Sequence, residues 1–81
     1  MKPGWVYIMS NGPFGTLYIG VTADVATRIL QHRNGQGSQF CKRYGLTRLV
    51  YLEPHDRIDA AIAREKAMKA WKRAWKTRLI E

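Results

Sequence analysis

Apolar residues form three short runs along the first two-thirds of the chain, and each run has the length and composition of a β-strand. Residues 5–9 (WVYIM) and 16–21 (TLYIGV) are rich in β-branched and aromatic side chains. The SNGPFG stretch between them supplies turn residues, so the two runs predict a β-hairpin with a loop longer than two residues. Residues 48–53 (RLVYLE) predict a third strand, which we expect to stop at Pro54.

The segment between the second and third runs combines a helical pattern with a polar stretch. Asp24 is a favourable N-cap, and the helix after it should run to about Arg33 and end at Asn34-Gly35. Residues 34–45 (NGQGSQFCKRYG) are polar, basic and glycine-spaced. We therefore expect this stretch to be an exposed loop.

The chain from about Asp56 onward contains no glycine or proline and predicts helix. At 100° per residue, four side chains fall on one face: Ile58, Ala61, Ile62 and Glu65. A second stripe starts on nearly the opposite side, with Trp71, Trp75 and Leu79. We therefore expect two helices, or one kinked helix, that change direction between about Met68 and Trp71.

Together these elements predict an α+β fold in the order ββαβαα, a three-stranded antiparallel sheet flanked by helices. With 81 residues, 46% of them hydrophobic, residues 1–81 are expected to form one domain. The single cysteine, Cys41, cannot form an internal disulfide, and no apolar run approaches the roughly 20 residues that span a bilayer. The N-terminus lacks the apolar region of a signal peptide, so we expect a soluble, cytoplasmic protein.

Charge adds the first indication of a partner. Fourteen Lys and Arg residues against six Asp and Glu residues give a net charge of +8, which favours a polyanionic partner. The basic residues spread over several predicted elements instead of lining one amphipathic face, which disfavours membrane-surface binding. Nucleic acid is the leading partner on charge, and the alternative is a small basic protein without such a role. Oligomeric state is not indicated.

Two residues of the predicted helix after Asp24 are candidates for anion binding. Arg28 and His32 lie one turn apart beside an apolar stripe formed by Val25 and Ile29, so they can converge on an anion. In the alternative, Arg28 lies along the surface and His32 caps a backbone carbonyl.

Glu65 lies in the middle of an apolar helix face, where a carboxylate is costly unless it is paired or bound to a metal. The alternative to metal binding is a structural ion pair, for which Lys69 and Lys72 project from the same side.

Two pairs of aromatic residues are also candidates. Tyr7 and Tyr18 sit in the paired strands and are expected to point to the same face of the sheet, either as packing or as part of a site. Trp71 and Trp75 are most simply core residues of the last helix.

In combination, WVYIM, TLYIGVT, RILQH and the later Glu65 resemble the GIY-YIG nuclease superfamily, which includes the N-terminal nuclease domain of a DNA-repair excinuclease. The similarity is greatest to the short stand-alone members, which share runs similar to GTLYIGVT, FCKRYGLTRLVYLE and AIAREKAMKAWKRAWKTRLIE. The second motif is intact as Tyr18-Ile19-Gly20, and the first keeps only its tyrosine in Trp5-Val6-Tyr7. The resemblance covers nearly the whole chain.

The resemblance implies a metal-dependent endonuclease that acts on DNA and leaves 5′-phosphate and 3′-hydroxyl ends. Glu65 would bind Mg²⁺ or Mn²⁺, because magnesium needs only one or two protein carboxylates beside phosphate oxygens. Arg28 would pair with a phosphate oxygen. Tyr7 would help to activate the water and Tyr18 would orient water or phosphate, although the two roles can be exchanged. A tyrosine of ordinary pKa needs a proton acceptor for this, such as His32.

Gly20 would allow backbone or substrate to approach closely, or would only kink the strand end. Binding of the flanking nucleic-acid backbone is assigned to six basic residues: Lys42, Arg43, Lys69, Lys72, Arg73 and Lys76. Such contacts carry little sequence information, so we expect DNA to be chosen by its structure. Two alternatives stay open: an inactive or weak nucleic-acid-binding module of the same fold, and a basic subunit that docks on a protein through Trp71 and Trp75.

Overall fold

The computed structural model describes residues 2–12 and 15–80. Its centre is a three-stranded antiparallel sheet in the order β2-β1-β3, with β1 at Gly4–Ser10, β2 at Leu17–Thr22 and β3 at Arg48–His55. The predicted hairpin is β1 and β2, and the predicted α+β class with one antiparallel sheet is confirmed.

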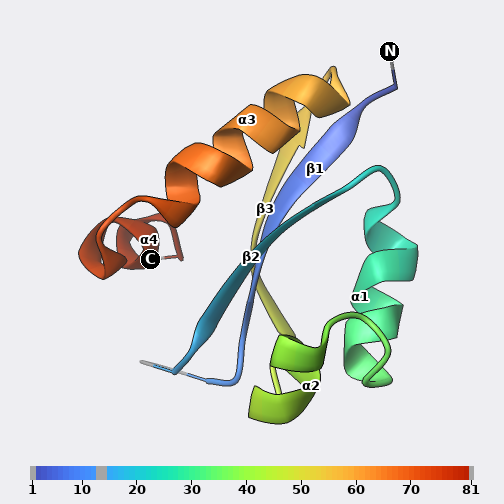
Figure 1. Cartoon of the computed structure of the whole chain (residues 1–81), viewed down its shortest axis with the longest axis vertical. Helices are drawn as coiled ribbons and strands as arrows, with labels where there is room; N and C mark the ends of the chain where they lie inside the picture. The colour runs from blue at the N-terminus through green and yellow to red at the C-terminus, as the bar shows by residue number, and fades with distance from the viewer. Residues whose placement is uncertain (1, 13–14, 81) are drawn as a thin grey trace.

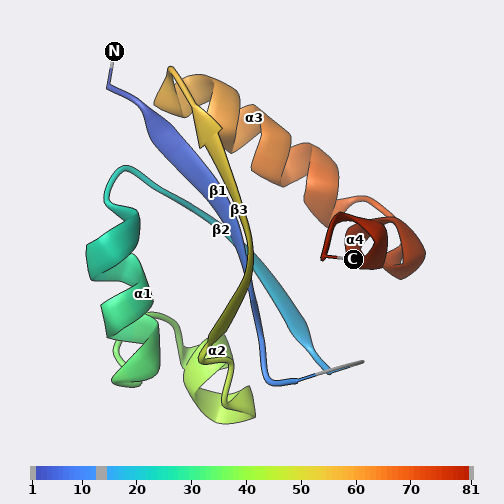
Figure 2. The ribbon, with the colours of Figure 1, turned by 180° about the vertical axis from the view of Figure 1, so that it is seen from behind.

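Helices cover both faces of this sheet. α1 (Val25–Arg33) and α2 (Gln39–Tyr44) lie on one side, and α3 (Ile58–Lys69) and α4 (Arg73–Ile80) lie on the other (Figure 1). Figure 1 looks at the β2 edge of the sheet, and the view from behind shows the β3 edge (Figure 2). None of the helices within the described residues is long and apolar enough to cross a membrane.

The central strand is buried on both faces, and its alternate residues build two separate cores. Val6 and Ile8 pack with Ala61 and Met68 of α3 and with other apolar residues of that side. Tyr7 and Met9 point the other way and pack with Cys41 and Leu46. Because successive side chains of a strand point to opposite faces, one short strand supplies the middle of both cores.

The predicted limits of the first and last helices are confirmed. Asp24 caps α1, its side chain accepting a hydrogen bond of 3.2 Å from the backbone N–H of Thr27, and Asn34 ends the helix. The C-terminal segment forms two helices that are interrupted between Lys69 and Arg73, as the change of the apolar stripe indicated.

The prediction of an exposed loop over residues 34–45 is wrong for its second half, which forms α2. Cys41 is buried beneath this helix, and Gly45 ends it in the left-handed conformation with φ 65°. The backbone N–H of Leu46 then donates to the carbonyl of Cys41 at 2.9 Å, and the Leu46 side chain is buried. A glycine followed by an apolar residue is a helix-ending pattern, and it is the sequence signal for this helix.

The prediction that the third strand stops at Pro54 is also wrong, because β3 continues to His55 and Pro54 pairs with Trp5. β3 is an edge strand, where a residue without an N–H costs no ladder hydrogen bond if its nitrogen faces outward. The pairing of β1 with β3 shifts between Ile8 and Met9, which leaves Val50 as the extra residue of a β-bulge.

Candidate active site

Tyr7 and Tyr18 lie on the same face of the sheet, as expected. Tyr7 pairs with Gly20 across the hairpin and Met9 pairs with Tyr18, so the tyrosines occupy adjacent positions on one face. Their ring centroids are 6.3 Å apart.

Gly20 is required for the position of the Tyr7 ring. A Cβ atom at Gly20 would lie 2.4 Å from both Cζ and Oη of Tyr7, far inside van der Waals contact. The ring of Tyr7 therefore lies across β2 at the one position of that strand without a side chain. Of the two interpretations of Gly20, close approach applies, and the approaching group is Tyr7.

The hydroxyl of Tyr7 meets His32 of α1. Tyr7 Oη and His32 Nε2 form a buried hydrogen bond of 3.0 Å. The His32 ring centroid lies 5.6 Å from the ring centroids of both Tyr7 and Tyr18. His32 therefore bonds to a tyrosine and does not cap a backbone carbonyl.

Burial controls the protonation of this pair. Burial raises the pKa of Tyr7 far above its ordinary value, Tyr18 and Glu65 raise it further, and the positive charge of Arg28 opposes them. Burial also lowers the pKa of His32, and Arg28 lowers it further. Both groups are therefore neutral at pH 7, and a hydrogen bond joins Tyr7 Oη to His32 Nε2. His32 Nδ1 is buried and has no partner within residues 2–12 and 15–80.

Arg28 lies one turn before His32 on α1 and is partly exposed. Its charge acts on both Tyr7 and His32, yet within the described part of the chain it forms no hydrogen bond or ion pair. A guanidinium group whose N–H donors are available, and whose neighbours are neutral, can bind an anionic ligand.

Glu65 approaches from the other side of the sheet, on α3. Its side chain is 15% exposed, and its Oε1 atom lies 3.2 Å from Nζ of Lys69, whose side chain is 53% exposed. The ion pair considered from the sequence therefore exists, with Lys69 and not with Lys72. Glu65 also raises the pKa of Tyr7, so its charge reaches the hydroxyl group on the opposite face.

The donor set of Glu65 fits a magnesium ion but not a metal that needs a full cage of protein ligands. No group of three or more His, Cys, Asp or Glu side chains that could hold a metal occurs among the described residues. Magnesium keeps several waters and is commonly bound through one or two carboxylates and substrate phosphates. A mostly shielded carboxylate, whose one ion pair among the described residues is with a half-exposed lysine, satisfies that requirement.

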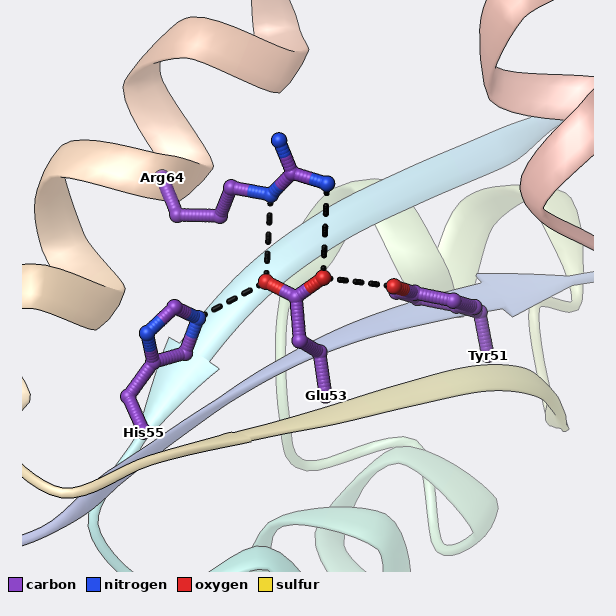
Figure 3. A network of polar contacts seen from close by, with 4 residues as sticks. All are labelled: Tyr51, Glu53, His55 and Arg64. Carbon is purple, nitrogen blue, oxygen red and sulfur yellow. Dashed lines mark hydrogen bonds and ion pairs between the residues drawn. The ribbon is translucent and has the colours of Figure 1, made fainter.

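A second polar cluster, which the sequence patterns above did not predict, joins β3 to α3 (Figure 3). Glu53 is its centre: Tyr51 Oη donates to Oε2 at 2.5 Å, His55 Nε2 lies 2.7 Å from Oε1, and Arg64 Nε donates to Oε1 at 3.1 Å. Burial alone would raise the pKa of Glu53, but the hydrogen bonds from Tyr51, His55 and Arg64 outweigh burial and lower it. Arg64 also lies over the ring of Trp71 at 4.8 Å.

The signal for this cluster is the alternation of Tyr51, Glu53 and His55, which puts three polar side chains on one face of a strand. A strand that stops at Pro54 would not include His55, so this prediction concealed the alternation of three polar residues. Because Arg64 directly precedes Glu65, the cluster fixes the segment of α3 that carries the candidate metal ligand.

The six predicted nucleic-acid-binding residues fall into two groups on opposite sides of the sheet (Figure 1). Lys42 and Arg43 are exposed on α2. Lys69 is paired with Glu65, and Arg73 donates from Nη2 to the carbonyl oxygen of Gly15. The other two, Lys72 and Lys76, lie with them on the α3–α4 side. The six residues therefore come from both sides of the sheet.

Comparison with known proteins agrees with the motif pattern. A family model described as the GIY-YIG catalytic domain matches residues 3–78. A UPF0213 protein of Staphylococcus saprophyticus is 39% identical over 80 residues, which cover 99% of this chain and 96% of that protein. A UPF0213 protein of Staphylococcus epidermidis is 33% identical over 81 residues, covering 100% and 98%. These names state no activity, and no solved structure matches.

Proposed function

Because this chain belongs to the GIY-YIG family, whose members are nucleases, we propose that it is a metal-dependent endonuclease that cuts DNA. The observation that carries the proposal is the hydrogen bond between Tyr7 and His32. The charges of Arg28 and Glu65 also act on the Tyr7 hydroxyl group, so all four residues converge on one point. The substrate would be chosen by structure, and the products would carry 5′-phosphate and 3′-hydroxyl ends.

We assign to the Tyr7–His32 pair the removal of a proton from the attacking water. With its raised pKa, Tyr7 is not ionised at neutral pH, so it accepts a proton only if it passes its own to Nε2 of His32. The lowered pKa of His32 keeps its ring unprotonated at neutral pH, and the negative charge of a bound phosphate would raise that pKa and favour the transfer. Tyr7 is 1% exposed in the substrate-free protein. Tyr18 and Arg28 are partly exposed and border the pair, so they are the side chains that move to admit water and phosphate.

Arg28 and Tyr18 are assigned to the phosphate. The guanidinium of Arg28 would donate to a non-bridging oxygen, and its planar group can donate two parallel hydrogen bonds. Tyr18 would orient the water or the phosphate from the solvent side of the pair.

We assign to Glu65 the binding of the metal ion, Mg²⁺ or Mn²⁺. When bound, such an ion would neutralise charge on the scissile phosphate and on the leaving oxygen. Lys69 would have to release the carboxylate, which costs little because the lysine is half-exposed and a helical ion pair of this spacing contributes about 0.3–0.5 kcal/mol.

Two observations favour a second candidate, a weak or inactive nucleic-acid-binding module. Tyr7 is closed to solvent, and Glu65 already has a cationic partner. In that case the chain would bind DNA in a salt-dependent manner and would not cut it.

A nicking assay separates the two candidates. Supercoiled and branched DNA are incubated with the protein in magnesium, in manganese and in chelator, with Tyr7→Phe as the test variant. Metal-dependent nicking that Tyr7→Phe abolishes supports the endonuclease. DNA binding without nicking under any metal condition supports the binding module.

A further inference from the structure

The short helix α2 presents two large aromatic side chains to solvent. Phe40 and Tyr44 are 43% and 44% exposed, lie one helical turn apart, and have ring centroids 4.9 Å apart. Large aromatic residues are usually more buried than this, so both residues keep an unusually large surface open to solvent.

The two rings continue a row of aromatic side chains that starts inside the candidate active site. The ring centroid of Phe40 lies 6.1 Å from that of Tyr18, which in turn lies 5.6 Å from that of His32. The row runs from the Tyr7–His32 pair through Tyr18 to the surface of α2. A group that binds on Phe40 and Tyr44 therefore sits next to the place where the phosphate is expected.

The exposure of these rings does not come from a loosely attached helix. Cys41 of α2 is buried in the core with Tyr7, and the buried side chain of Leu46 anchors the end of the helix. The helix is thus held to the core through Cys41 and Leu46, and Phe40 and Tyr44 lie beside Cys41 with part of their surface open to solvent.

The surroundings of the two rings are cationic. α2 has no acidic residue, and Lys42 and Arg43 are both exposed. The guanidinium carbon of Arg43 lies 5.7 Å from the Tyr44 ring centroid. An open cleft of about 700 Å³ is lined by Gln39, Phe40, Lys42, Arg43 and Tyr44. Aromatic faces flanked by positive charge match the bases and phosphates of a nucleic-acid strand.

We propose that Phe40 and Tyr44 form a stacking platform for unpaired nucleotides next to the scissile phosphate, with Lys42 and Arg43 holding their phosphates. The inference rests on the proposed function, because it assigns a substrate class to that site. Inside duplex DNA both faces of each base are covered by neighbouring bases, so away from a duplex end only an unpaired base can stack on a protein ring without opening the stack. The substrate is therefore a branched or tailed nucleic acid with a single-stranded segment beside the cut.

Binding to tailed duplexes in chelator tests the platform without requiring cleavage. The probes are one duplex with a short thymidine tail and the same duplex with an abasic tail of equal length, which keeps the phosphates and removes the bases. A uridine tail distinguishes a preference for DNA from one for RNA. We expect the protein to bind the thymidine tail roughly 5- to 100-fold more tightly than the abasic tail.

The variants Phe40→Leu and Tyr44→Leu should each reduce this ratio and leave binding of the abasic tail unchanged. Phe40→Tyr and Tyr44→Phe keep a ring and should keep the ratio. Unfolding midpoints confirm that the Leu variants are folded, which their exposed positions favour. Equal affinity of the parental protein for both tails, or equal loss on both tails in the Leu variants, would overturn the platform. So would self-association of the free protein that either Leu variant abolishes.

Nicking assays with the same proteins distinguish the failure of this inference from that of the proposed function. If the tail preference depends on Phe40 and Tyr44 but no metal-dependent nicking occurs, the platform stands and the endonuclease fails. If the parental protein nicks DNA but does not distinguish the tails, the endonuclease stands and the platform fails.

Discussion

Replacing Glu65 with glutamine removes the charge that would hold a metal and keeps the size of the side chain. In the structure the only ion pair of Glu65 within the described residues is with Lys69, one turn along α3 and 53% exposed. A pair of this kind contributes about 0.3–0.5 kcal/mol to the free energy of unfolding. A loss of about 3–5 kcal/mol, as for a fully buried ion pair, is therefore not expected. If Glu65 binds the metal, the nicking rate should fall at least about 100-fold, because a bound ion supplies several kcal/mol of charge stabilisation.

Lys69→Gln is the matched control, since it removes the same ion pair but leaves the carboxylate in place. We compare the nicking rates of the parental protein, Glu65→Gln and Lys69→Gln at saturating DNA. Under that condition, the loss of a contact between Lys69 and the DNA backbone weakens binding without changing the rate. Each unfolding midpoint is also measured with and without Mn²⁺, because a ligand that binds only the folded state stabilises it. Glu65→Gln should lose both nicking and the Mn²⁺-dependent rise of the midpoint, and Lys69→Gln should retain both.

A folded Glu65→Gln variant that nicks DNA at the parental rate would refute the metal assignment. Loss of activity in both variants, with midpoints unchanged by Mn²⁺ in all three proteins, would refute it as well. That result would make the ion pair itself the functional feature of this turn of α3.

Four further measurements test other parts of the structure. Gly20→Ala puts a methyl group against the Tyr7 ring, so the free energy of unfolding should fall by about 1–3 kcal/mol in denaturant titrations, together with the nicking rate; an unchanged stability would contradict the geometry. The lowered pKa of His32 means that the folded state resists protonation, so stability present above pH 6.5 should be lost as pH falls toward the folded-state pKa. His32→Gln should flatten this dependence, and an unaltered pH profile would exclude His32 as its source. Glu53→Gln leaves Arg64 without its carboxylate and should lower the thermal midpoint by an amount equivalent to about 2 kcal/mol. An unchanged midpoint would show that water already screens the charges of this cluster. With about four to six phosphates neutralised, the logarithm of DNA affinity should fall against the logarithm of salt concentration with a slope of about −4 to −5, and a flat response would contradict phosphate binding.

Local patterns predicted the parts of this fold that depend on local physics. The β-branched and aromatic composition of the two runs and the turn residues between them indicated the hairpin, whose pairing puts Tyr7 and Tyr18 on one face. The Asp24 cap and the shift of the apolar stripe near Trp71 predicted the helix boundaries. Each of these features is decided by residues that are close in the sequence, within one helix end or one hairpin.

The features that local patterns did not predict depend on contacts between distant segments. The hydrogen bond from Tyr7 to His32 spans 25 positions, so no local pattern specifies it. Pro54 predicts a strand end because the sequence does not reveal that β3 lies at the sheet edge. The polar composition around α2 concealed a helix whose only buried side chain is Cys41.

The proline and the bulge in β3 have a consequence for aggregation. An edge strand offers unpaired N–H and C=O groups to which another chain can add its own strand. On β3, Pro54 has no N–H group with which another strand could pair. Near the other end of the strand, the bulge at Val50 interrupts the regular spacing of the backbone N–H and C=O groups. A second chain therefore finds only a few consecutive residues with which to pair. The irregularities that made this strand hard to predict thus also protect the β3 edge of the sheet from pairing with another chain.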